Sequence, residues 1–182
     1  MPYLIIVTGR PGSGKTTFAK ELSDKIYMPL ISRDQIKEGY VHTLGKNHTK
    51  LPPEANKIAT EIFFDTLMGL MENNISVIAE AAFQHEVWSS MLKRFMEIEK
   101  IRLYLLICKI DSKLALERYV NRGLNNELRE YFHGDIGVAM ARKGLDLKIS
   151  PYNEPQLNIP TFHIDTSAEY NPSIDELRQA IF

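Results

Sequence analysis

The sequence predicts an α/β fold in three layers, with a five-stranded parallel sheet between helices on both of its faces. Short apolar runs alternate along the chain with segments whose apolar residues recur at helical spacing. This alternation is typical of parallel strands joined by helical crossovers. Right-handed crossovers place helices on both faces, and ligands then bind at the carboxyl ends of the strands. The 182 residues fit a single domain, residues 1–182.

The expected strands are nearly continuous apolar runs, as in strands buried on both faces. They are Tyr3–Thr8, Leu30–Ser32, Ile75–Ala79, Arg102–Ile110 and Thr161–Asp165. The expected helices carry apolar residues three or four positions apart, so that one face can pack on the sheet. They are Gly14–Tyr27, Gln35–Thr43, Glu54–Glu72, Glu86–Glu99, Ser112–Arg122 and Ser173–Ile181. Asp111 can cap the helix that follows it. Leu44–Pro53 is predicted to be a loop, and Gly123–Pro160 is polar with no clear element.

Composition narrows the classes of function. Apolar residues make up 44% and charged residues 25% of the chain, as in ordinary globular proteins. The net charge of -1 argues against a long nucleic-acid partner, which usually requires a basic surface, and leaves only a small local basic patch open. No window approaches the roughly 20 apolar residues of a membrane span, and we expect no signal peptide, because Met1–Tyr3 lacks a basic stretch. We therefore expect no membrane partner and a cytoplasmic location. The single cysteine, Cys108, lies in an apolar run and is expected to be a core thiol.

The strongest signal is the segment Gly9–Thr16, GRPGSGKT, which fits the phosphate-loop pattern G-x-x-x-x-G-K-[ST]. It lies between an expected buried strand and an expected helix, which is the context the pattern requires. Its glycines let backbone N–H groups surround a triphosphate, and the helix start favours anions. Lys15 adds a charge at the β- and γ-phosphates, and the Thr16 hydroxyl ligates Mg²⁺. The residues expected to contact a purine nucleoside triphosphate here are Gly12, Ser13, Gly14, Lys15, Thr16 and Thr17.

Two acids follow expected strands at the phosphate end of the sheet. Asp34 comes after the second strand and Glu80 after the third. An acid at such a position often holds Mg²⁺, directly or through water, and a second acid can accept the proton of an attacking hydroxyl. We assign Asp34 as the base and Glu80 as the metal-side or substrate-binding acid. The alternatives are a helix cap for Asp34 and a solvated strand end for Glu80. Arg33 can hold substrate or pair with an acid, and both interpretations stay open.

Three arginines indicate a lid over roughly residues 118–135. Arg118 and Arg122 are four apart on an expected helix and share a face, and Arg129 follows a flexible-looking stretch. Mobile arginines can close over the charge that develops on a transferred phosphoryl group and exclude water. The alternative is a solvated basic helix face, with Glu117 and Glu127 as its ion-pair partners.

Together these motifs resemble the small P-loop kinases of the nucleoside-monophosphate-kinase-like group. Within it, the sequence is similar to predicted ATP-dependent kinases near chloramphenicol phosphotransferase, gluconate kinase and zeta toxin. The phosphate loop is the only highly specific piece, and the others are persuasive as a set that spans nearly the whole chain. The matching pieces are GRPGSGKTTFA at Gly9–Ala19, ISRD at Ile31–Asp34, VIAEAAF at Val77–Phe83, LERYVNRG at Leu116–Gly123 and FHIDTS at Phe162–Ser167.

The resemblance implies transfer of the γ-phosphoryl group of ATP to a hydroxyl of a small-molecule acceptor, with Asp34 as the base. It further implies that Arg118 stacks on adenine, that Arg122 reaches the phosphates from the lid, and that Thr166 and Ser167 border the adenine. The implied sheet order is 2-3-1-4-5.

The chain departs from the group at one point, because Cys108-Lys109 stands where a metal-binding aspartate is sought after the run Leu103–Ile107. Glu80 therefore carries the metal-side expectation. The segment Gly39–Pro53 is expected to help select the acceptor. Two other functions remain: an ATP-binding switch protein that transfers nothing, and a kinase of a nucleic-acid 5′ end or of a protein.

Overall fold

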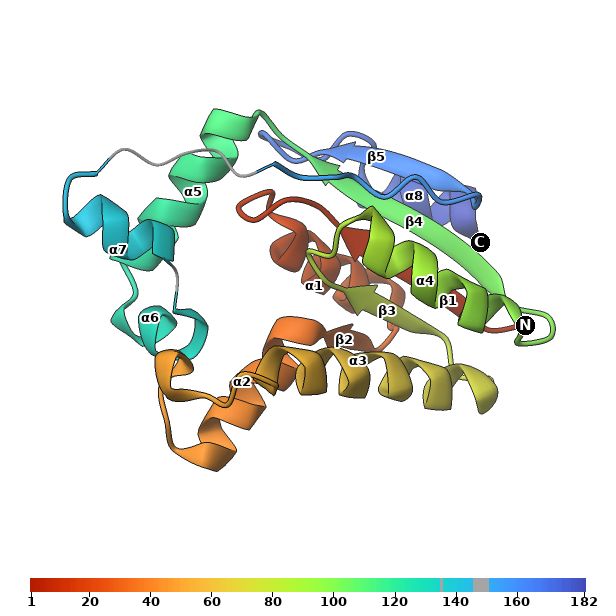
Figure 1. Ribbon diagram of the computed structural model, residues 1–182. Coiled ribbons are helices and arrows are strands. Elements are labelled where there is room, and N and C mark those ends of the chain that lie inside the picture. The colour runs from red at the N-terminus through yellow and green to blue at the C-terminus, as the bar shows by residue number, and fades with distance from the viewer. Residues whose placement is uncertain (135, 146–150) are drawn as a thin grey trace.

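The computed structural model describes residues 1–134, 136–145 and 151–182, and its centre is a sheet of five parallel strands. The strands follow the order β2-β3-β1-β4-β5 (Figure 1). They are β1 (Tyr3–Thr8), β2 (Leu30–Ser32), β3 (Val77–Glu80), β4 (Arg102–Lys109) and β5 (Thr161–Asp165). The predicted parallel α/β sheet and its predicted order are both confirmed.

The helices that connect the strands, and the one that follows the last strand, form where they are predicted, with ends shifted by a few residues. They are α1 (Lys15–Ile26), α2 (Arg33–Leu44), α3 (Ala55–Glu72), α4 (His85–Met96), α5 (Ser112–Leu124) and α8 (Ile174–Ile181). The Asp111 side chain accepts hydrogen bonds from the backbone N–H groups of Lys113 and Leu114, so the predicted cap of α5 is present.

Three short elements lie where no helix is predicted. They are the 3-10 turn η1 (His48–Lys50) and the helices α6 (Glu127–His133) and α7 (Ile136–Arg142). Each is too short to show a repeating apolar face, and helices of this length depend on contacts with the rest of the chain. In this protein α5 contacts both α6 and α7, and α6 contacts α2 and η1.

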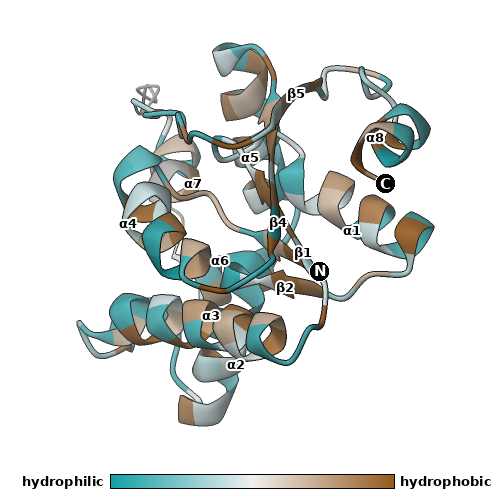
Figure 2. Cartoon of the chain, turned by 90° about the vertical axis from the view of Figure 1, so that its right-hand side faces the viewer, coloured by the Kyte–Doolittle hydropathy of each residue, from teal (hydrophilic) through white to brown (hydrophobic). Residues whose placement is uncertain are grey.

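The sheet separates two apolar cores, as expected for a three-layer fold. Leu4 and Ile6 of β1 face α3 and α4, whereas Ile5 and Val7 face α1 and α8. Successive strand residues point to opposite faces, so a strand covered on both sides is apolar throughout. Figure 2 shows α3 and α4 on one side of the apolar strands and α1 and α8 on the other. Cys108 belongs to the second core, as predicted.

The carboxyl end of β1 is fixed by a buried polar contact just before the phosphate loop. The Thr8 hydroxyl donates to the carbonyl oxygen of Ala81 at 2.8 Å and accepts from Nε1 of Trp88 at 3.3 Å. Trp88 is 1% exposed and packs edge-on against the rings of Phe63 and Phe64. The core therefore holds the strand end from which the phosphate loop departs. In the part of the chain that the structure describes, no helix is both long and apolar enough to cross a membrane.

Candidate active site

The phosphate loop runs from β1 to α1 in a backbone shape that requires glycine. Gly12 and Gly14 have φ angles of 83° and 79°, in the left-handed region that favours glycine. A Cβ on Gly12 would lie 2.0 Å from the carbonyl oxygen of Ala115, because the loop packs directly against the backbone of α5. The loop and the helix that carries Arg118 and Arg122 are thus in backbone contact.

The start of α1 offers the groups that a phosphate needs. The helix begins at Lys15, its first turn carries no acidic residue, and Gly14 supplies no side-chain cap. Its first N–H groups therefore face the loop with the positive end of the helix dipole. Among the described residues, the hydroxyl of Ser13 is buried without a hydrogen-bond partner. Thr16 and Thr17 are exposed in the first turn.

The Glu80 carboxylate contacts both the start of α1 and the end of β2. Glu80 is the last residue of β3, 2% exposed, and lies in register with Val7 of β1 and Ser32 of β2. Ser32 Oγ donates to Oε2 of Glu80 at 2.6 Å, and Thr16 Oγ1 donates to Oε1 at 3.2 Å. Lys15 Nζ lies 3.8 Å from the same Oε1. The alternative of a solvated strand end is wrong, because the strand extends through this acid and buries it.

The residues around Glu80 fit a magnesium ion. Mg²⁺ prefers oxygen ligands and usually takes one or two from the protein, completing its shell with phosphate oxygens and water. The Thr16 hydroxyl and the Glu80 carboxylate supply such oxygens side by side at the phosphate loop. Within the described residues, no group of three His, Cys, Asp or Glu side chains could hold a metal by itself. A metal at the loop would therefore share its ligands with a bound nucleotide.

Asp34 lies at the start of α2, two residues beyond Ser32. Its side chain is 50% exposed and occupies the first turn, where a carboxylate interacts favourably with the helix dipole. The N-cap of α2 is Ser32, so the alternative of Asp34 as the cap is wrong. The base prediction for Asp34 is compatible with this exposed position at the phosphate end of the sheet.

Arg33 pairs with an acid, which is one of its two predicted interpretations. Its Nη1 lies 3.5 Å from Oδ1 of Asp34. Nη2 donates to the backbone oxygen of Asn56 at 3.0 Å and to its side-chain oxygen at 3.1 Å, and Nε donates to Thr60 Oγ1 at 3.4 Å. The guanidinium is thus anchored to α3 beside the candidate base. Its role toward substrate stays a prediction.

Arg118, predicted to stack on adenine, lies together with Thr166 and Ser167, predicted to border it. Arg118 donates to the carbonyl oxygens of Thr166 at 2.9 Å and Ser167 at 2.7 Å. Thr166 Oγ1 in turn donates to the carbonyl oxygen of Ser13 at 2.6 Å. The solvated-face alternative therefore does not apply to Arg118, whose guanidinium is bound to the loop after β5. Arg122 follows one turn later on α5.

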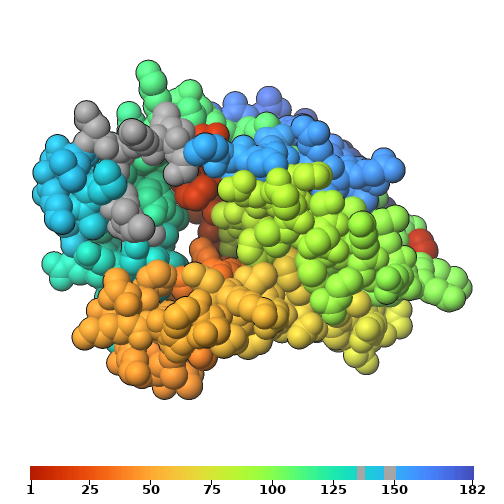
Figure 3. Space-filling view, in the orientation of Figure 1, coloured from red at the N-terminus to blue at the C-terminus, as the bar shows by residue number. Residues whose placement is uncertain are grey.

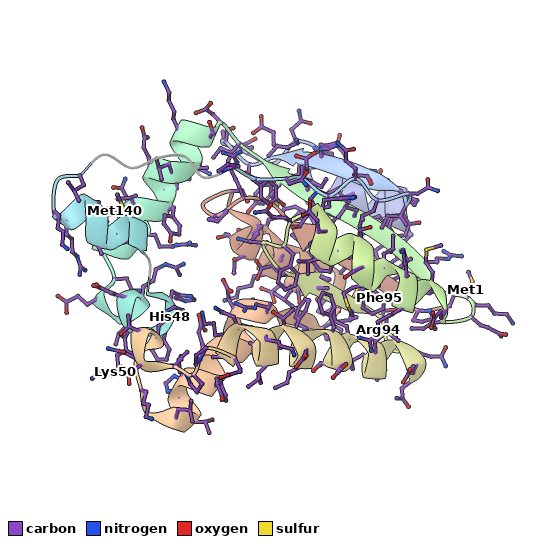
Figure 4. The ribbon with its side chains drawn as sticks, viewed as in Figure 1. Met1, His48, Lys50, Arg94, Phe95 and Met140 are labelled. Atoms are coloured by element: carbon purple, nitrogen blue, oxygen red, sulfur yellow. The ribbon has the colours of Figure 1, made fainter. Side chains whose placement is uncertain are left out.

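The segment predicted to form a lid lies against the phosphate loop at Tyr119 and contacts α2 at its other end. We call residues 118–134 the lid segment; position 135 of the predicted range lies outside the described residues. His133 Nε2 lies 2.9 Å from Glu38 Oε1, and the Phe132 and His42 rings are 4.7 Å apart. Figure 3 shows an opening between the lid segment, α2 and the N-terminal part of the chain. Figure 4 shows His48 at the junction of η1 and α6, where it lies against Gly134.

Several residues of the site carry no local sequence signal. Asn56 and Thr60 support Arg33 from positions that no motif includes, and Ser32, which supports Glu80, lies in the ISRD segment without a predicted role there. The contact between His133 and Glu38 joins segments that are far apart in sequence. Only the parallel register could have placed Ser32 opposite Glu80, and that register is not readable from a strand of three residues.

Comparison with known proteins agrees with this fold. Residues 4–140 match the family model described as an AAA domain. A kinase candidate from Chloroflexus aurantiacus superposes with a TM-score of 0.76 at 23% identity, covering 98% of this chain and 97% of that one. A gluconokinase from Sinorhizobium meliloti 1021 gives 0.51 at 14%, covering 99% and 89%. The Pnkp1/Rnl/Hen1 RNA repair complex gives 0.56 at 17%, covering 86% and 50%. The comparison with curated proteins gives no match. The P-loop fold implied by the resemblance is confirmed.

Proposed function

We infer the function of this chain from its family: it belongs to the AAA domain family, whose model matches residues 4–140. We propose that it transfers the γ-phosphoryl group of ATP to a hydroxyl of a small-molecule acceptor, with Mg²⁺ as cofactor. The observation that carries this proposal is the position of Glu80. Its carboxylate contacts Lys15 and Thr16 on one side and Ser32 on the other, so the end of β2, which leads into Asp34, lies beside the phosphate loop.

The phosphate loop and the first turn of α1 would bind the triphosphate. Backbone N–H groups of Gly12, Ser13 and Gly14 surround the phosphates, and Lys15 stabilises charge on the β- and γ-phosphates. Thr16 and Glu80 would hold Mg²⁺, directly or through water, and the ion would neutralise phosphate charge when bound. Thr17, exposed in the first turn of α1, would also contact the nucleotide.

Asp34 would accept the proton of the acceptor hydroxyl. As that oxygen bonds to the γ-phosphorus, the bond from the phosphorus to the β–γ bridging oxygen breaks, and ADP leaves with the electron pair. A base must lie within hydrogen-bond reach of the hydroxyl, and the half-exposed carboxylate at the start of α2 can meet an acceptor there. Glu80 is buried and already bound by two hydroxyls, which favours its metal-side role over substrate binding.

The nucleotide base and the lid would complete the site. The contact of Arg118 with Thr166 and Ser167 places these residues beside the phosphate loop, where we propose that they border the adenine. Arg122 would reach the transferred phosphoryl group from the lid segment and stabilise its charge, while the lid keeps water from competing with the acceptor.

A turnover assay tests the proposal. The protein is incubated with Mg·ATP and pools of hydroxyl compounds, and phosphorylated products are detected by mass spectrometry together with ADP release. We expect one class of hydroxyl compound to gain a phosphoryl group. Normal binding of Mg·ATP with no hydroxyl compound ever phosphorylated would leave the switch-protein alternative in its place.

One observation favours a second candidate, a kinase of a nucleic-acid 5′ end. A pocket of about 440 Å³ between α2, η1 and α6 is lined by Lys46, Lys50 and Tyr131 together with Gly45 and Asn47. Amines that neutralise phosphates and a ring that stacks on a base suit a short single strand. With a 5′-hydroxyl oligonucleotide as acceptor, Lys46→Ala with Lys50→Ala should then weaken acceptor binding and its salt dependence, whereas Lys57→Ala on α3 should not. Equal KM values for the oligonucleotide in the wild type, the double lysine variant and Lys57→Ala would exclude this candidate.

A further inference from the structure

We propose that Ser32 is a positioning residue that orients Glu80 for magnesium binding. This inference deepens the proposed function and rests on the part of it that assigns Mg²⁺ to Thr16 and Glu80. Ser32 itself would touch neither metal nor nucleotide. It would act through the carboxylate that its hydroxyl binds.

The sheet register places the two residues opposite each other. Ser32 is the last residue of β2 and pairs with Glu80, the last residue of β3. Their side chains are 48 positions apart in sequence, yet Ser32 Oγ lies 2.6 Å from Glu80 Oε2. Ser32 is 3% exposed and Glu80 2%, so water does not compete for this bond. A short, buried hydrogen bond to a carboxylate is among the stronger ones in proteins.

The two carboxylate oxygens of Glu80 have different neighbours. Oε1 faces the phosphate loop, 3.2 Å from Thr16 Oγ1 and 3.8 Å from Lys15 Nζ. Oε2 accepts the hydrogen bond of Ser32. Holding Oε2 fixes the plane of the carboxylate and thereby directs Oε1 at the position beside Thr16. Without Ser32 the carboxylate could turn, and the nearby Lys15 ammonium would compete with a metal for it.

The position of Ser32 makes the contact unusual. Serine at a helix N-cap ordinarily uses its side-chain oxygen to accept a backbone N–H of the first turn. Ser32 is the N-cap of α2, but its side chain makes no cap hydrogen bond. Its hydroxyl is instead turned to Glu80. A purely local role in starting α2 therefore does not explain the residue, whereas a role in orienting Glu80 does.

The test compares nucleotide binding with and without the metal. Affinity for a non-hydrolysable ATP analogue is measured by calorimetry in saturating Mg²⁺ and in EDTA, and the ratio gives the contribution of the metal. We expect Ser32→Ala to lower this ratio roughly 10- to 100-fold, the usual effect of removing a group that orients a metal ligand. Affinity in EDTA should stay at the wild-type value. Ser32→Thr, which keeps the hydroxyl, should retain most of the ratio.

Ser23→Ala is the matched control. Ser23 Oγ also makes a 2.6 Å hydrogen bond, to the carbonyl oxygen of Met28 at the far end of α1. Its removal should leave the metal contribution unchanged. In a Glu80→Gln background, Ser32→Ala should cause no further loss, because the two residues act as a unit. If Ser32→Ala does not fold, Ser32→Cys, a near-isosteric and weaker donor, should show a smaller loss of the same ratio.

The inference is overturned if the Ser32 variant keeps the wild-type metal contribution, if its affinity falls equally in EDTA, or if its effect persists in Glu80→Gln. These outcomes differ from a failure of the proposed function. A protein that phosphorylates no acceptor, but whose Mg²⁺-supported binding depends on Ser32, would refute phosphoryl transfer and support the positioning role.

Discussion

Replacing Asp34 with asparagine should separate phosphoryl transfer from nucleotide binding. Asparagine has nearly the same size and shape but cannot accept the acceptor proton. The side chain is 50% exposed, so the change removes no core packing. Affinity for Mg·ATP should stay within about twofold of wild type, since surface changes of this kind usually alter free energies by no more than about 0.5 kcal/mol.

The expected loss of turnover follows from the role of a general base. Such a group contributes roughly 10²- to 10⁴-fold, which corresponds to about 2.7–5.5 kcal/mol of activation free energy. The stability cost should be small. Asp34 lies in the first turn of α2, and loss of a carboxylate there costs roughly 0.3–1 kcal/mol, or about 1–4 °C in Tm for a chain of this size.

Asp175→Asn provides a matched control. Asp175 lies in the first turn of α8, is 58% exposed, and has the cation Lys25 at 3.2 Å, much as Asp34 has Arg33 at 3.5 Å. Both variants should show the same small fall in Tm. Only Asp34→Asn should lose kcat, measured as ADP release with the acceptor identified by screening, while calorimetry reports the affinity for Mg·ATP.

Two outcomes would refute the assignment. Retained kcat in Asp34→Asn would show that another group, or the solvent, takes the proton. A loss of Mg·ATP affinity as large as the loss of kcat would show that Asp34 supports nucleotide binding and not the chemical step.

Three further predictions test the site and the core. In Gly12→Ala, the Cβ would meet the Ala115 carbonyl at 2.0 Å and the φ of 83° would add roughly 1–2 kcal/mol of backbone strain, so calorimetry should show loss of Mg·ATP binding; unchanged binding would contradict the required loop shape. Phe63→Ala should lower the free energy of unfolding by roughly 3–5 kcal/mol in urea titrations, because the ring is fully buried; a fall below about 1 kcal/mol would contradict this. Burial raises the pKa of Cys108 from 9.0 to about 12, so its thiol should resist disulfide reagents at mildly alkaline pH until the protein is unfolded. As the pH rises, the unfolded chain loses this proton before the folded protein does. The thiol's contribution to the free energy of unfolding is therefore complete below pH 9.0 and is lost as the pH rises toward about 12. Comparing the pH dependence of unfolding in wild type and Cys108→Ala would check this.

The parts of the fold that the sequence predicts are those with a repeating apolar pattern. Strands such as β1 are buried on both faces and appear as continuous apolar runs, and long helices such as α3 show one apolar side. The short helices α6 and α7 have no such repeat. Retrospectively, α6 does carry local signals: Asn126 caps its start and Gly134 ends it in the left-handed conformation. These single residues do not outweigh a polar segment without periodicity.

In the candidate site, too, some residues can be predicted from the sequence and others cannot. The phosphate loop can be recognised in the sequence because its residues are consecutive. Asp34 and Glu80 can be recognised because each follows an expected strand. The contacts that orient them depend on tertiary structure. Ser32 reaches Glu80 only through the strand register, and Arg33 finds its anchors on a helix more than one element away. Which side chain supports a candidate catalytic group is therefore not readable from the local sequence.

The contact between the lid segment and α2 would have a consequence for the proposed reaction cycle. His133 reaches Glu38, and Phe132 packs on His42, so the segment that carries Arg122 rests on α2, the helix whose first turn holds Asp34. A phosphorylated acceptor formed between them would be enclosed by both. Its escape would require these contacts to break and then to form again around the next acceptor. The cycle would thus contain an opening step in which no covalent bond changes, and the strength of this contact would limit how fast product departs.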